Sequence, residues 1–132
     1  MSFDPGLVHT PLTPFTSDRR IDFDTFAKSI EFHLRHGAQA LAVPMHAGES
    51  VSLTDAERRQ LISFAVEHAA KRVPVIAHVS DAGTGIAAAL ARHAQAAGAT
   101  AIVATTPYYW TPPPAMLLEH FVPIGEIGRA HV

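Results

Sequence analysis

The sequence predicts an α/β fold built around a parallel sheet. Short apolar segments alternate with longer segments whose apolar residues recur at helical spacing. Unbroken apolar runs are typical of parallel strands covered on both faces, and their alternation with helices indicates βαβ units. Residues 37–43 and 98–104 are near copies in pattern. Both an open doubly wound sheet and a (β/α)₈ TIM barrel satisfy this alternation.

The elements follow in order from local signals. The first strand is expected at residues 7–8, and the first helix after Asp22, whose carboxylate suits an N-cap. Gly37 lies where a helix end favours a left-handed residue. Thr54 and Glu57 have the spacing of a capping box and start the second helix, and Gly98 ends the third. The remaining strands are expected at residues 38–43, 73–79 and 99–104.

Composition narrows the class of protein. The 132 residues are 48% hydrophobic, carry a net charge of −2 and include no cysteine. The apolar content is enough for one ordinary core, and the absence of a basic excess argues against a nucleic-acid or membrane partner. Disulfides and thiol nucleophiles are excluded. With neither a membrane-length apolar run nor a secretory signal, a cytoplasmic protein is expected.

Four segments in register carry a family resemblance. They are residues 10–16, 48–50, 73–77 and 106–109, the last reading Thr-Pro-Tyr-Tyr. Together they resemble the dihydrodipicolinate synthase / N-acetylneuraminate lyase family. The resemblance implies the N-terminal half of a (β/α)₈ TIM barrel, about four βα units over residues 1–126, because a full barrel needs eight. Residues 127–132 resemble a translated sequencing adapter and are expected to be a non-native tail.

The resemblance also implies an activity. Members of the family are class I aldolases and related lyases, which condense, cleave or dehydrate a 2-keto acid such as pyruvate through a lysine Schiff base. No metal or organic cofactor is implied, and the full-length form is expected to be a homo-oligomer, a homotetramer in many relatives. Here the only lysines are Lys28, in the first helix, and Lys71, before the third strand. Neither suits the nucleophile, so we expect the 132-residue chain alone to be inactive.

The resemblance designates candidate site residues. Tyr109 matches a tyrosine that joins a hydroxyl proton relay in relatives and often reaches a neighbouring subunit; an interface aromatic is the alternative. Where relatives have two threonines, this chain has His46 and Ala47. We expect His46 to take over acid–base work, since histidine titrates near neutral pH. Ala47 and Gly48 would frame the substrate carboxylate through backbone groups, and Glu49 is expected to be a buried anchor.

Two other classes of function stay open from the residues. His9, His46 and His78 fall at or near the ends of the first three strands, and three imidazoles at a barrel mouth suit Zn²⁺. That arrangement would indicate a metal-dependent hydrolase or lyase. Alternatively, the half-barrel is a non-catalytic module, although its first and last strands would then expose unpaired edges.

Overall fold

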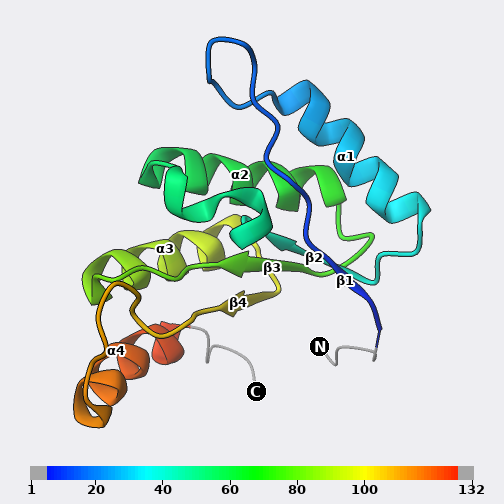
Figure 1. Ribbon diagram of the computed structural model, residues 1–132. Helices are drawn as coiled ribbons and strands as arrows, with labels where there is room; N and C mark the ends of the chain where they lie inside the picture. Colours follow the sequence, from blue (N-terminus) through cyan, green and yellow to red (C-terminus); the bar gives the residue numbers. More distant parts are fainter. Residues whose placement is uncertain (1–5, 128–132) are drawn as a thin grey trace.

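The computed structural model describes residues 6–127, which form a four-stranded parallel sheet flanked by helices (Figure 1). The strands are β1 (Val8–His9), β2 (Ala40–Val43), β3 (Val75–His78) and β4 (Ala101–Val103). The α-helices are α1 (Phe23–Arg35), α2 (Asp55–Ala69), α3 (Thr84–Ala97) and α4 (Pro114–Ile127). Two 3₁₀ helices, η1 (His46–Gly48) and η2 (Ser50–Ser52), lie between β2 and α2. The predicted alternation is confirmed, with strands shorter than their apolar runs.

The strand order separates the two candidate architectures. The order is β1-β2-β3-β4, and each strand pairs in parallel with the next in sequence. A doubly wound sheet reverses its strand order at a switch point, whereas a TIM barrel adds each strand beside the last. The described chain is therefore a sector of a barrel, with four of its strands side by side.

Alternate strand residues face the helices and form two apolar clusters. In the first cluster, Leu41 and Val43 of β2 pack with α1 and α2, and in the second, Ala77 of β3 packs with α2, α3 and Ile124 of α4. Fully burying a side chain the size of Leu41 stabilises the fold by about 1.5–3 kcal/mol. Because successive strand residues point to opposite faces, the residues between them, such as His78, face the inner side of the sheet.

The helix caps confirm the predicted ends of the helices. The backbone N–H of Thr25 donates to Asp22 Oδ1 at 2.9 Å, which confirms the N-cap of α1. The capping box of α2 is also confirmed, because Glu57 Oε2 accepts from the Thr54 N–H at 2.8 Å and Thr54 Oγ1 accepts from the Glu57 N–H. Gly98 follows α3 with φ 89°, a left-handed conformation that glycine adopts without steric cost.

The far end of the described chain is helical. Ile127 is the last residue of α4 and packs against the second apolar cluster. Residues 128–132 lie outside the described residues, so the expectation of a non-native tail over 127–132 stays a prediction. Across residues 6–127, every helix falls short of the length or hydrophobicity that a bilayer crossing requires.

Candidate active site

The carboxyl ends of the four strands lie at one edge of the sheet, and the loops that leave them form the mouth of the barrel sector. His46 begins η1 just after β2, His78 ends β3, and Tyr109 lies in the loop after β4. Parallel pairing of Val43 with Ala77 and of His78 with Val103 brings these strand ends together. The structure therefore places His46 and Tyr109 at the same end of the sheet, where TIM-barrel active sites lie.

Two imidazoles meet at this mouth. The rings of His46 and His78 have centroids 5.3 Å apart and planes inclined at 61°. His46 is exposed, whereas His78 is 1% exposed, and neither ring nitrogen of His78 has a hydrogen-bond partner among the described residues. A buried polar group without a partner costs about 1–3 kcal/mol, so this arrangement needs an explanation.

Burial keeps the His78 ring neutral. Desolvation, followed by the nearby charges of Arg58 and His46, lowers the pKa of His78 from its ordinary value of 6.5 to about 4. The carbonyl of Pro44 opposes this shift weakly, although its geometry falls short of a hydrogen bond. At neutral pH, His78 therefore presents one N–H and one nitrogen lone pair.

A buried arginine fixes the end of β3 behind this imidazole pair. Arg58 of α2 is 3% exposed, and its guanidinium donates to the carbonyl of Ser80 at 2.7 Å and to Asp81 Oδ2 at 3.3 Å. Ser80 Oγ in turn accepts from the backbone N–H of Thr105 at 2.8 Å. The loops after β3 and β4 are thus tied to each other and to α2, which gives the mouth a rigid frame.

The loop after β2 packs closely on the first strand's loop. Gly48 is buried, and a Cβ there would lie 3.2 Å from both the Pro11 carbonyl oxygen and Thr13 Oγ1. Thr13 Oγ1 donates to the Gly48 carbonyl at 2.6 Å, and the Gly48 N–H donates to Met45. Glycine allows this close approach, and its own N–H is already used within the loop.

Glu49 does not follow its prediction. It was expected to be a buried anchor, but its side chain is exposed and its backbone is left-handed, with φ 58°. The left-handed turn joins η1 to η2 and points the side chain outward, so the loop is anchored by Thr13 and Gly48 instead.

Tyr109 is held in an unusual conformation. Its φ is 88°, and its side chain is 100% exposed, so it is not packed against His46. A bulky residue in this region costs about 1–3 kcal/mol and persists only where the surroundings impose it. The following prolines at positions 112–114 restrict this loop further.

The alternative of a three-histidine metal site is not supported by the structure of residues 6–127. His9 does not face the mouth; its Nδ1 lies 2.9 Å from Nδ1 of His33 on α1, on the helix-covered side of β1. Partial burial, followed by the neighbouring His9 and His36, lowers the pKa of His33. Within residues 6–127, no group of three histidine, cysteine, aspartate or glutamate side chains is placed to hold a metal ion.

Neither lysine is placed at the mouth. Lys28 is exposed on α1. Lys71 is exposed before β3, at the opposite end of the sheet, where it borders a cavity of about 610 Å³ between α2 and α3. The expectation that these lysines are misplaced for nucleophilic attack agrees with the structure.

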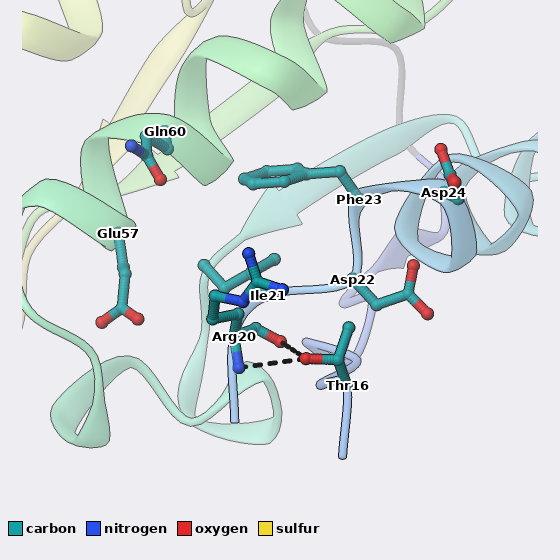
Figure 2. A pocket seen from close by; sticks show the side chains of 8 residues that line it. All are labelled: Thr16, Arg20, Ile21, Asp22, Phe23, Asp24, Glu57 and Gln60. Atoms are coloured by element: carbon teal, nitrogen blue, oxygen red, sulfur yellow. Dashed lines mark hydrogen bonds between the residues drawn. The ribbon is translucent and has the colours of Figure 1, made fainter. Parts of the chain in front are cut away.

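A second cavity lies beside the mouth rather than in it. This cavity of about 470 Å³ lies between the turn at residues 16–24 and the first turns of α2. Figure 2 shows the side chains that line it. Thr16 Oγ1 donates to the Arg20 carbonyl at 3.1 Å and closes the turn. The Asp22 and Glu57 carboxylates on its wall already serve as helix caps. Both of these carboxylates are therefore already engaged in capping.

The fold and its mouth define a sector of a (β/α)₈ barrel with acid–base side chains at the strand ends. A comparison with family profiles identifies the class further: the profile described as the Dihydrodipicolinate synthetase family matches residues 4–129. The chain belongs to this family, as the sequence resemblance predicted.

Individual relatives agree. The chain is 38% identical over 121 residues to 4-hydroxy-tetrahydrodipicolinate synthase of Rhizobium meliloti, covering 92% of this chain and 41% of that protein. The crystal structure of dihydrodipicolinate synthase from Aquifex aeolicus superposes with a TM-score of 0.89 at 35% identity, with the same coverage. YagE of Escherichia coli K12, solved in complex with pyruvate, gives a TM-score of 0.90 at 31% identity.

The chain thus spans about 41% of the length of these relatives and corresponds to the N-terminal half of their barrel. The comparisons give no support to a metal-dependent hydrolase or a non-catalytic module.

Sequence reasoning missed the most informative contact of the mouth. His78 was considered only as a metal ligand, and its pairing with His46 was not predicted. The signal was available, because both residues follow adjacent predicted strands and should meet at one edge. The roles of Arg58 and Ser80 had no comparable signal, since an arginine within a helix usually faces solvent.

Proposed function

We propose that this chain forms the N-terminal half of the active-site mouth of a dihydrodipicolinate synthase-type lyase. Its substrate would be pyruvate or a related 2-keto acid, bound as a Schiff base to a lysine. The observation that carries the proposal is the placement of His46 and Tyr109 on loops that leave the same end of a parallel barrel sector. The names of relatives and the pyruvate complex of YagE support the substrate class.

The residues present suit the proton transfers of this chemistry. When an amine adds to the keto group, water leaves and a methyl proton must be removed to form the enamine. His46 is exposed at the mouth and takes that proton, since imidazole accepts protons near neutral pH. Tyr109 serves as a hydroxyl relay, because a phenol both donates and accepts a hydrogen bond.

The loop at η1 would hold the substrate carboxylate. The Ala47 N–H precedes the first hydrogen bond of η1 and is the donor we assign to the carboxylate. Gly48 frames that position, because its contact with Pro11 and Thr13 fixes the loop while its own N–H is bonded to Met45. The missing hydroxyls of the family's two threonines are thus replaced by an imidazole and a backbone amide.

The proposed function needs a nucleophile and partner subunits that this chain does not itself supply. Lys28 and Lys71 are both away from the mouth, so a lysine of the remaining barrel forms the Schiff base. We infer a cytoplasmic homo-oligomer, with a homotetramer as the expected form. Leu12, Val51 and Trp110 are exposed near the mouth, where the remaining half of the barrel or a partner subunit would cover them.

A chimera tests the proposal. Residues 1–126 are joined to the part of the Rhizobium meliloti synthase that continues beyond the matched region, and the product is treated with pyruvate and borohydride. We expect mass spectrometry to find one reduced pyruvate adduct, on a lysine of the appended half. The unmodified Rhizobium meliloti enzyme is the positive control.

The 132-residue chain alone is the matched negative control. It should form no adduct, because neither of its lysines lies at the mouth. A folded chimera that forms no adduct would contradict the proposed function. An adduct on Lys28 or Lys71 in the isolated chain would contradict the assignment of the nucleophile.

A further inference from the structure

The described part of the molecule contains a pair of imidazoles on the outer side of β1 (the outer pair, His9 and His33) and another at the mouth (the mouth pair, His46 and His78). The outer pair serves as a reference for the geometry of the mouth pair. The His9 and His33 rings have centroids 5.0 Å apart and planes inclined at 81°, and their Nδ1 atoms are 2.9 Å apart. At this separation, an N–H of one ring donates to the lone pair of the other. The pair therefore shows which ring geometry accommodates a direct bond in this chain.

The mouth pair has nearly the same geometry without the bond. The centroids of His46 and His78 are 5.3 Å apart, with planes inclined at 61°. Both nitrogens of His78 are buried and without a partner in the described part of the chain. The centroid separation is close to that of the bonded His9–His33 pair, so turning the rings is the movement that would bring a nitrogen of each within bonding distance.

We propose that His78 is a positioning residue for His46: rotation of the rings brings one nitrogen of each together, and His78 accepts the N–H of His46. The bond fixes the tautomer and orientation of His46, leaving its other nitrogen directed toward the mouth. The inference rests on the proposed function, because it gives His46 the orienting partner that a general base requires.

The surroundings favour His78 as the acceptor. The charged group that faces it from α2 is Arg58, whose guanidinium is held by Ser80 and by the carboxylate of Asp81. Arg58 and burial both disfavour a second positive charge, so His78 stays neutral when His46 is protonated. A neutral imidazole beside an imidazolium offers the lone pair that the charged ring needs.

The bond is measurable in the full 132-residue chain without substrate. Histidine is labelled with ¹⁵N, and scalar coupling across N–H···N bonds is recorded from pH 5 to 8. We expect coupling for His46–His78 in addition to that of His9–His33, which serves as the internal reference. Coupling for the outer pair with none for the mouth pair at any pH would overturn the proposal.

Two variants separate orientation from packing. In His78→Phe the ring remains but cannot accept, so exchange of the His46 N–H with solvent should speed up about tenfold or more. In His78→Gln the amide oxygen accepts, and slow exchange should be retained. His33→Phe, the matched control, should remove only the outer coupling. Unchanged exchange in a folded His78→Phe chain would contradict the inference.

The chimera supplies an activity readout that needs no acceptor substrate. Exchange of the pyruvate methyl protons with D₂O should slow about tenfold in His78→Phe and within about threefold in His78→Gln. His78→Phe should add nothing in a His46→Gln background, because His78 acts through His46. Additive effects would refute positioning, even where borohydride trapping succeeds and the proposed function holds.

Discussion

The mouth pair, His46 and His78, and the outer pair, His9 and His33, are both pairs of imidazoles, but they differ in burial and in hydrogen bonding. On the outer side of β1, His9 and His33 are half-buried, and their Nδ1 atoms are bonded to each other at 2.9 Å. At the mouth, His78 is more deeply buried yet keeps both nitrogens unpaired. The hydrogen bond between His9 and His33 contributes to stability, whereas the buried, unpaired nitrogens of His78 cost free energy, and such groups are kept where they serve a site.

The two pairs also differ in what holds them in place. The outer pair joins a strand to the helix that covers it. The mouth pair lies between the loop after β2 and the end of β3, and its frame comes from Arg58, Ser80 and Thr105 behind it. Changes to that frame should therefore have the largest effects on the molecule, and changes to the outer pair the smallest.

Removing the buried arginine should be the most damaging change. Arg58→Ala removes the donor to the Ser80 carbonyl and to Asp81 Oδ2, while Asp81 Oδ1 keeps its bond from the Gly83 N–H, so the free energy of unfolding should fall by about 3–5 kcal/mol. Urea denaturation measures this. Arg92→Ala, on the exposed face of α3, is the control and should change stability by less than about 0.5 kcal/mol. Similar losses in both variants would contradict the framing role.

The buried His78 should make the fold sensitive to acid. Its native pKa of about 4 lies below the ordinary value of 6.5, so the unfolded chain binds the proton more readily. Stability is therefore full above pH 6.5 and falls as pH drops toward 4, by on the order of 3 kcal/mol. Denaturation curves of His78→Gln should lose this component of the pH dependence. An unchanged slope between pH 6.5 and 4 would argue against a buried neutral imidazole.

The glycine of the mouth loop should be sensitive to one added methyl group. Gly48→Ala places a Cβ 3.2 Å from Pro11 and Thr13, and should destabilise the fold by about 1–3 kcal/mol. Gly85→Ala in α3 is the matched control, since a Cβ there meets nothing within 4 Å. It should stabilise the helix by up to about 1 kcal/mol. Thermal unfolding compares the two, and equal shifts would remove the close-approach argument.

The outer pair should give the smallest loss. His33→Phe breaks one half-buried hydrogen bond, so unfolding free energy should fall by about 0.5–1.5 kcal/mol. The mouth coupling between His46 and His78 should remain. A loss above that of Arg58→Ala would reverse the ranking of the two regions.

Local signals predicted most of the fold. The cap of α1 at Asp22 and the capping box at Thr54 were legible, because caps depend on neighbouring residues alone. Apolar periodicity found the strands, but it did not separate a barrel from a doubly wound sheet, since strand order is a long-range property. The family resemblance resolved that question, and the strand order of the structure agrees.

The site was less accessible to sequence reasoning. The strand ends carrying His46 and Tyr109 were correctly assigned to one edge, which depends only on parallel topology. The expectation that His9 faces the mouth was wrong, because a residue at the end of a two-residue strand can point to either face of the sheet. The prediction that Glu49 is buried was wrong for a similar reason, since a left-handed backbone in an irregular loop decides where its side chain points.

One measurement tests the functional difference between the two imidazole pairs most directly. Pyruvate methyl exchange is compared in the chimera carrying His46→Gln and in the chimera carrying His33→Gln. The account predicts that the first variant slows exchange by about 10²–10⁴-fold and that the second leaves the rate within about twofold. Equal rates in the two variants would contradict the assignment of proton transfer to the mouth.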